Sequence, residues 1–476
     1  MGLPQVFAAI EQAFKNEDLV RVEALLWPAL EQFSEISQLW FYGGCIFFKT
    51  GRAAVAARLF DRAIELDDAA HVYSNLGAAY RRMNLQNEGR LVLQQALDRS
   101  PDYAPALVNM GSMFVNEGEP HNGIPYLEKA VEIGTERGAN WNLGLLYLEA
   151  GRFGEGFDCY RRGVSHERLE RKFGGKDGIP EPKMLDPADV RAGKRLIVWG
   201  EQGIGDELMF GTILEEARAQ FGEVIFECHP RLLNLHRTAH PGLTLYPTRK
   251  DEHIAWPMND RVIADYKCGI GDLGALYRRD TQSFIEAWQR SGPTYRADEA
   301  ETARYRKNLL EIADGRKIVG LATKGGVMQT ARTYRTLKQA DVNALFGETE
   351  CLFVALDYDD MMPFAHYIHD KFGEHRYKWF PSVVQHYDYD HTAAIVAACD
   401  LTVTVCQSVA HLSAAMGCPT RVLTPKRCAW RYALLKEDPQ RWAWYPDPKV
   451  KLYRQSDPES WKEPMGRVIE DIQRLA

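Results

Sequence analysis

Hydrophobic positions recur along the chain in two different ways. Up to about residue 170, glycine returns every 33 or 34 positions, at Gly44, Gly77, Gly111 and Gly144, and an aromatic residue follows each by three positions. From Lys194 onwards, short apolar runs of strand type alternate with segments of helical spacing. The first pattern predicts stacked helix pairs, and the second predicts parallel α/β sheets. We therefore expect an α + α/β fold, in which a helical solenoid precedes a pair of Rossmann-like domains.

Small residues recur in register with these glycines, at Ala63, Ala96, Ala130 and Gly163. Small side chains let paired helices approach closely, and the aromatic side chains fill the space between them. The register resembles that of the tetratricopeptide (TPR) repeat. This resemblance implies four helix pairs from Ser37 to about Lys172, after a degenerate first pair over residues 4–36 that caps the stack. We expect residues 1–172 to form the repeat domain.

Three asparagines share one position of the repeat, on the inner helix of each pair: Asn75, Asn109 and Asn142. A side-chain amide donates to and accepts from a peptide unit at once, so these residues predict a groove that grips an extended acceptor peptide or protein. The alternative is that asparagine merely suits a solvated inner face. On either interpretation the array is a binding surface, through which the chain could also form oligomers.

A stretch rich in glycine and proline predicts a linker over residues 173–192. Beyond it, apolar runs predict strands at 195–199, 224–228 and 243–246 in a first lobe (193–315), and at 317–322, 352–356, 401–405 and 421–423 in a second lobe (316–455). A helical pattern covers residues 456–476 at the end of the chain. Two such lobes in series predict a cleft that is faced by loops from both.

The turn after the strand at 195–199 reads G-E-Q-G-I-G-D-E over residues 200–207. Glycines let a backbone approach a ligand closely, and a helix N-terminus presents free N–H groups. Leu208 stands where a dinucleotide-binding G-x-G-x-x-G turn has its third glycine, after Gly203 and Gly205. We therefore expect no NAD-type cofactor at this turn.

Three motifs follow one another in this half of the chain: G-E-Q-G-I-G-D-E, then D-L-T-V-T-V-C-Q-S-V-A-H-L-S-A-A-M-G-C-P-T (400–420), then A-W-R-Y (429–432). Together they resemble the ADP-heptose:lipopolysaccharide heptosyltransferases, and bacterial hybrids that join a TPR array to such a domain. The resemblance implies a GT-B fold and an inverting, metal-independent glycosyltransferase. It also implies a nucleotide-diphosphate sugar as donor substrate and no further cofactor. The order of domains resembles the O-GlcNAc transferases in architecture only.

Inverting transfer needs a carboxylate to take the proton of the acceptor hydroxyl. Asp206 matches the aspartate that the heptosyltransferases place at this turn, so the resemblance implies that Asp206 is the catalytic base. The alternative is a helix N-cap, a position that aspartate favours. If Asp206 is the base, the acceptor-side loop consists of Glu201, Gln202, Gly203 and Gly205. If Asp206 only caps the helix, the substitute bases are Glu201 and Glu207.

Positive charge and N–H groups should stabilise the departing diphosphate. The resemblance implies that Ser408 and His411 contact it, and that Lys324 and Arg335 supply cations. Donor-binding roles are likewise implied for Gln407, Trp430 and Arg431. Each has a structural alternative, such as a packed histidine or a solvated basic loop. The sequence departs from the family at Cys406-Gln407, where the relatives carry aspartate and threonine, and this departure bears on the identity of the donor.

Composition narrows the classes of partner. The net charge of −7 argues against a nucleic-acid partner held by phosphate neutralisation. Nine scattered cysteines form neither a zinc motif nor a disulfide framework, and no apolar run is long enough to cross a membrane, so we expect a cytoplasmic protein. The asparagine register favours a protein acceptor over lipopolysaccharide. Two alternatives remain: a lipopolysaccharide-type heptosyltransferase, and a TPR scaffold whose transferase lobes have lost activity.

Overall fold

The computed structural model describes residues 2–115, 117–134, 137–163, 181–201, 203–248, 264–326, 332–384, 389–435 and 437–475. The chain forms two compact units, Met1–Leu146 and Tyr147–Ala476. Their boundary falls within one helix, α9. The predicted end of the repeat domain at 172 and start of the linker at 173 lie outside the described residues, as does Gln202.

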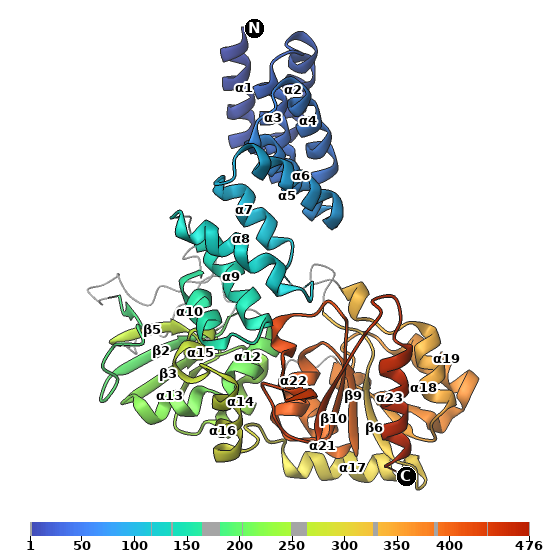
Figure 1. The fold of residues 1–476 in the computed structure, drawn as a ribbon. Helices are drawn as coiled ribbons and strands as arrows, with labels where there is room; N and C mark the ends of the chain where they lie inside the picture. The colour runs from blue at the N-terminus through green and yellow to red at the C-terminus, as the bar shows by residue number, and fades with distance from the viewer. Residues whose placement is uncertain are drawn as a thin grey trace. The chain divides into compact units, whose positions relative to one another are not determined.

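The first unit consists of helices that pair in sequence (Figure 1). They are α1 (Leu3–Lys15), α2 (Leu19–Gln32), α3 (Ser37–Lys49), α4 (Ala53–Leu66), α5 (Ala70–Arg82), α6 (Gln86–Arg99), α7 (Ala104–Ser112), α8 (Pro120–Glu132) and the first part of α9 (Arg137–Glu149). The repeated glycines mark where the helices of a pair touch. A Cβ built on Gly77 would lie 2.5 Å from Cγ of Leu93, and one on Gly111 would lie 2.4 Å from Cγ of Leu127. Only glycine permits this approach, which explains the register.

The first lobe of the second unit contains a five-stranded parallel sheet in the order β1-β5-β2-β3-β4. Its strands are β1 (Lys183–Met184), β2 (Arg195–Trp199), β3 (Glu223–Glu227), β4 (Thr244–Tyr246) and β5 (Tyr266–Gly269). The associated helices are α12 (Ile204–Gly211), α13 (Leu214–Gln220), α14 (Leu233–Ala239), α15 (Gly274–Tyr277) and α16 (Thr281–Ser291), with short 3₁₀ turns η1 (Pro230–Leu232) and η2 (Ile270–Leu273). The strand order reverses between β2 and β5, where ligands of such sheets bind.

The second lobe contains an eight-stranded sheet in the order β11-β12-β13-β10-β9-β6-β7-β8. Its strands are β6 (Ile318–Ala322), β7 (Leu352–Ala355), β8 (Tyr377–Lys378), β9 (Leu401–Val405), β10 (Thr420–Thr424), β11 (Leu434–Leu435), β12 (Asp438–Trp442) and β13 (Val450–Arg454). Strands β6 to β10 and β13 pair in parallel, and β11 and β12 extend the sheet antiparallel. The order reverses between β6 and β9. The predicted α + α/β fold class is confirmed.

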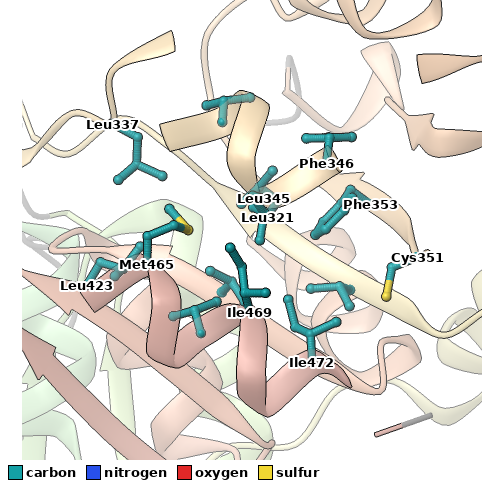
Figure 2. Packing of buried hydrophobic residues seen from close by; sticks show 14 of the residues in the cluster. Leu321, Leu337, Leu345, Phe346, Cys351, Phe353, Leu423, Met465, Ile469 and Ile472 are labelled. Atoms are coloured by element: carbon teal, nitrogen blue, oxygen red, sulfur yellow. The ribbon is translucent and has the colours of Figure 1, made fainter. Parts of the chain in front are cut away.

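Helices pack on the second sheet and enclose its main core. They are α17 (Glu299–Ala313), α18 (Gln339–Gly347), α19 (Met362–Phe372), α20 (Pro381–Val384), α21 (Asp390–Ala398), α22 (Ser408–Ala415) and α23 (Lys462–Gln473). Figure 2 shows Met465, Ile469 and Ile472 on one face of α23, beside strand residues such as Leu423. This spacing of apolar residues is that of a helix with one buried face. The core fixes the strands whose carboxyl ends carry the candidate site.

Helix α10 (Phe153–Gly163) follows α9 and belongs to the second unit. It packs on η2 and α15 of the first lobe. Figure 1 shows it beside α15. Its ring of Phe157 makes edge contacts with Trp430 and Trp444, which come from the C-terminal part of the chain. The helix that carries the last predicted repeat residue, Gly163, is therefore part of the α/β unit.

Candidate functional site

The turn after β2 positions Asp206 at the switch point of the first sheet. Gly203 is the N-cap of α12, and its N–H donates to Oδ2 of Asp206 at 3.1 Å. Asp206 is thus the third residue of α12. One interpretation of the sequence placed it at the N-cap, and the structure shows that it does not occupy that position. Its carboxylate closes the first turn of the helix and keeps its other oxygen, Oδ1, for a second partner.

That second partner is Arg431, which comes from the other lobe. Nε of Arg431, in the 3₁₀ turn η6 (Trp430–Tyr432), donates to Oδ1 of Asp206. Burial lowers the pKa of Arg431, but the charge of Asp206 and its hydrogen bond outweigh this effect, and the pKa is raised overall. Both side chains are largely buried, with 13% and 21% of their surface exposed. The pair joins residues 225 positions apart.

The second sheet reverses between β6 and β9, and the loops after both strands carry predicted donor-binding residues. Lys324 follows β6, and Gln407 and Ser408 follow β9. The two loops lie in contact, because a Cβ built on Gly325 would lie 2.7 Å from the carbonyl oxygen of Cys406 and 2.9 Å from Cβ of Arg335. The structure therefore brings these four predicted residues to one edge of the sheet.

Lys324 and the loop that carries it are each close to an aspartate at this edge of the sheet. Nζ of Lys324 lies 3.6 Å from Oδ2 of Asp359, and both side chains are about one-third exposed. Asp357, a buried neighbour, accepts hydrogen bonds from Thr323 and from the N–H of Lys324, and its pKa is raised by burial. The loop after β6 is thus fixed by a carboxylate, while the ammonium group of Lys324 remains at the surface.

Helix α22 begins at this edge with Gln407 as its N-cap. Ser408 is its first residue, and its Oγ lies 2.6 Å from the hydroxyl of Tyr389. Gln407 is 6% exposed, and in the described part of the chain neither amide atom of its side chain has a hydrogen-bond partner. A buried polar group without a partner is costly, so such groups call for a specific explanation.

His411, one turn into α22, is fully enclosed. Its Nδ1 lies 3.3 Å from the hydroxyl of Tyr445, and its ring packs against Tyr432 and Trp442. Burial lowers the pKa of His411 to about 3, against an opposing effect of Asp206. The imidazole is neutral at physiological pH, so it can offer a hydrogen bond but no charge to a phosphate.

The turn of the first lobe meets the helix of the second at Gly205. A Cβ built on Gly205 would lie 3.2 Å from Cδ2 of His411 and 3.3 Å from Cα of Ser408. On the far side of α12, Nε1 of Trp444 donates to the carbonyl oxygen of Met209 at 2.9 Å. The first turns of α12 and α22 therefore touch, and each carries predicted site residues.

The two substitute carboxylates lie apart from this contact. Oε1 of Glu207 accepts the N–H of His229 at 2.7 Å and lies 3.2 Å from Nε2 of His236, and its side chain is fully buried in the first lobe. Oε1 of Glu201 accepts the N–H of Gly271 at 2.7 Å and is also buried. Both carboxylates hold the first lobe together where they stand.

A buried aspartate beside Glu201 was not predicted. Asp272 lies in η2 after β5, across the switch point, and its Oδ2 accepts the N–H of Gly269 at 3.1 Å. Burial raises its pKa to about 7. The signal was present in the sequence, because G-I-G-D occurs twice, at 203–206 and at 269–272, with the same cap in both copies.

Trp430 lies next to Arg431, but its ring is enclosed by protein. It is 2% exposed and contacts Phe157, Tyr160 and Phe210. The ring thus packs between α10 and α12. Its predicted donor contact stays a prediction.

The three predicted groove asparagines all lie in the first unit, and each donates a hydrogen bond within the array. Nδ2 of Asn75 donates to the carbonyl oxygen of His71, Nδ2 of Asn109 to Ser74, and Nδ2 of Asn142 to Oγ of Ser112 at 2.8 Å. All three side chains are half-buried. Each Nδ2 thus donates at least one hydrogen bond within the array, and the amide oxygens are the atoms that could accept from a peptide.

Among the residues that the structure describes, no group of three or more His, Cys, Asp or Glu side chains is arranged to hold a metal ion. No helix in the same parts of the chain combines the length and apolar character needed to cross a membrane. Metal-independence remains a prediction from the resemblance.

Comparison with known proteins adds the following. Residues 104–133 match the tetratricopeptide repeat family, which confirms the TPR prediction. The chain is 23% identical to Protein FlbA of Caulobacter vibrioides over 485 residues, covering 91% of this chain and 78% of FlbA. Among solved structures, MamA covers 35% of this chain and 95% of its own length, with 20% identity and a TM-score of 0.31. PilW, a type IV pilus biogenesis factor, covers 46% and 86%, with 17% identity and a TM-score of 0.33.

Proposed function

We propose that the second unit is an inverting, metal-independent glycosyltransferase. It transfers a sugar from a nucleotide-diphosphate donor to a hydroxyl group, and the acceptor is a protein that the TPR array binds. The observation that carries the proposal is the contact of Gly205 with Ser408. Two parallel sheets present their switch points to each other there, and ligands of such sheets bind outside the carboxyl ends at that point.

The chemistry at this contact divides between the lobes. Asp206 is the base, because its carboxylate stands where the two lobes meet and an ionised carboxylate can accept the proton of an attacking hydroxyl. The donor diphosphate lies toward α22, where Ser408, the free N–H groups of the helix and Lys324 meet its charge. Neutral His411 supports the turn from behind. Arginine, lysine and backbone donors stabilise the leaving diphosphate, so the mechanism needs no metal.

A protein acceptor is supported by the first unit. TPR arrays bind peptides and proteins through their inner helices, and the amide oxygens of Asn75, Asn109 and Asn142 can accept peptide N–H groups. Such contacts tolerate many sequences because they read the peptide backbone. The array would then present the acceptor chain, and the α/β unit would select its hydroxyl.

One observation favours a second candidate, a TPR interaction protein without transferase activity. Asp206 is paired with Arg431, and the hydroxyl of Ser408 is bonded to Tyr389, so two predicted site groups are occupied by the protein itself. Cys406 and Gln407 also replace the aspartate and threonine of the family. In this candidate the same contacts serve only to hold the lobes together.

Nucleotide binding separates the two candidates. We expect at least one of UDP, GDP, ADP, CDP and dTDP to raise the melting temperature of the full chain. If none does, the scaffold candidate is preferred.

Transfer is then tested by the masses of cellular proteins when the chain is expressed. Asp206→Asn should abolish a sugar-sized mass shift and preserve nucleotide binding. Asp298→Asn is the matched control, because Asp298 caps α17 by accepting the N–H of Glu301 at 2.8 Å and lies outside the site. Transfer at the normal level by the Asp206 variant would refute its role as base.

A further inference from the structure

Arg231 joins the first lobe to the second at the edge of the candidate site. It lies in η1, directly beyond the carboxyl end of β3, and its N–H donates to Nδ1 of His229 at 3.2 Å. Its carbonyl oxygen accepts the N–H of Tyr389, from the second lobe, at 2.8 Å. Nearby, Nδ2 of Asn234 donates to Oδ2 of Asp390 at 2.7 Å. The loop after β3 is thus attached to the start of α21.

The side chain of Arg231 reaches Ser408 through one ring. Its guanidinium carbon lies 5.5 Å from the centre of the Tyr389 ring, and the hydroxyl of that ring lies 2.6 Å from Oγ of Ser408. The pKa of Tyr389 is raised by burial, although Ser408 and the charge of Arg231 act against this, so the phenol is neutral at physiological pH. The guanidinium of Arg231, the phenol of Tyr389 and the hydroxyl of Ser408 are therefore linked in that order, and Ser408 is the first residue of α22.

Two polar groups in this surrounding lack partners. Nε of Arg231 is buried and has no hydrogen-bond partner in the part of the chain that the structure describes. The same is true of both amide atoms of Gln407, whose residue is 94% buried at the N-cap of α22. A buried donor without an acceptor destabilises the protein, so a ligand that supplies the acceptor is bound more tightly. Gln407 is the N-cap of α22, and Arg231 is linked to the same helix through Tyr389 and Ser408. A helix N-terminus by itself favours an anion.

We propose that Arg231 is a phosphate-binding residue of the donor site, supplied by the first lobe. This inference rests on the proposed function and adds a residue that neither the motifs nor the resemblance indicated. A diphosphate offers several acceptor oxygens and no donor at neutral pH. It can therefore engage the guanidinium fork of Arg231 while its other oxygens face Ser408 and the N–H groups of α22. The hydroxyl of Tyr389 makes with Ser408 the hydrogen bond that a phosphate oxygen would make.

This arrangement has a consequence for the lobes. Because Arg231 stands on the first lobe and α22 on the second, a diphosphate held by both connects the lobes at the donor side. The neighbouring charges favour this role, since Asp206 is already neutralised by Arg431 and Asp390 accepts a hydrogen bond from Asn234. The cation over Tyr389 thus faces no unpaired carboxylate among these partners.

The test is calorimetric titration of the full chain with the nucleoside diphosphate that stabilises it, and with the matching nucleoside. Arg231→Ala should weaken diphosphate binding at least tenfold and leave nucleoside binding unchanged. Arg231→Lys should fall between, because lysine keeps the charge but lacks the fork. Arg218→Ala is the control, because Arg218 is an exposed arginine of the same lobe, paired with Glu215 three positions earlier.

The outcomes distinguish this inference from the proposed function. If the unaltered chain binds a diphosphate and both Arg231 variants bind it equally well, the inference is wrong and the proposed function stands. If the unaltered chain binds none of the five diphosphates, both fail. A loss of nucleoside binding that parallels the loss of diphosphate binding would assign Arg231 a structural role. The lysine variant keeps the test decisive if the alanine variant does not fold.

Discussion

Gln407 offers a test in which stability and binding should change in opposite directions. Its side chain is 6% exposed, both of its amide atoms are without partners in the described part of the chain, and it makes no side-chain cap to α22. Gln407→Met replaces the amide by an apolar group of similar length and removes no hydrogen bond that the structure shows. The substitution should therefore remove the energetic cost of a buried amide without partners, and it should create no new unsatisfied group.

The size of the effect follows from the cost of buried unsatisfied groups. Leaving one such group costs about 1–3 kcal/mol, so relief at Gln407 should raise the free energy of unfolding by about 1–3 kcal/mol. For a unit of this size that corresponds to a rise in melting temperature of roughly 1–4 °C. A ligand that needs the amide should bind less well to the same variant. Sites that sacrifice stability for binding show this combination.

The assay is scanning fluorimetry of the full chain with and without nucleoside diphosphate. Gln339→Met is the matched control, because Gln339 is an exposed glutamine in the first turn of α18 in the same lobe, and its melting temperature should stay within about 1–2 °C. A melting temperature of the Gln407 variant at or below that of the unaltered chain would show that the amide is already satisfied. Our reasoning about an unmet ligand contact would then be wrong.

Three further predictions concern the packing and charge of the second unit. Gly205→Ser should lower its melting temperature and impair activity, because a side chain there meets Cα of Ser408 at 3.3 Å, whereas Gly203→Ser, whose Cβ meets nothing closer than Oδ2 of Asp206 at 3.5 Å, should be neutral. Equal effects of the two would contradict the close approach. The raised pKa of Asp272, about 7, means that the folded state binds its proton more tightly, so the free energy of unfolding should fall by roughly 3 kcal/mol as pH rises from 4 to 7. Asp272→Asn should make the free energy of unfolding less dependent on pH, as measured by urea titrations at several pH values. The same pH dependence in the variant and the unaltered chain would refute this prediction. A fragment of residues 137–476, which keeps α10, should melt cooperatively. A fragment of residues 173–476 should aggregate, because the rings around Trp430 become exposed when α10 is removed. If the shorter fragment folds, α10 is dispensable.

Much of the fold follows from local pattern. The strands at 195–199 and 401–405 have the predicted bounds because each is a short run rich in apolar and β-favouring residues that ends in a turn of glycine or polar residues. Strand β5 was not predicted, since it has only four residues and contains Lys267. That lysine is 1% exposed, and its Nζ lies 2.5 Å from Oε1 of Glu181. A buried charge hides the strand in the sequence, because its partner stands 86 positions away.

The candidate site was predicted in its parts but not in its connections. Local signals predicted the strand-to-helix turns that carry Asp206 and Ser408, and the family resemblance implied the roles of these two residues. Neither could give the pairing of Asp206 with Arg431, or the contact of Ser408 with Tyr389, since both depend on how the lobes pack. Nor could they separate a helix cap from a base. In the structure one oxygen of Asp206 accepts the N–H of Gly203 and the other accepts a hydrogen bond from Arg431 of the second lobe, a contact that neither interpretation included.

The contacts between the lobes differ in kind on two sides of the site. On one side Phe157 packs against Trp430 and Trp444, rings that are almost fully buried. On the other side the link between Asn234 and Asp390 is an exposed hydrogen bond. Separating the rings exposes apolar area at about 25 cal/mol per Å², whereas an exposed polar link exchanges with water at a net cost of only about 1 kcal/mol. The interface should therefore open first along its polar edge and pivot on the aromatic side. The polar edge is the one that carries Arg231. Under the proposed function, a donor would therefore enter on the side where Arg231 binds its phosphates.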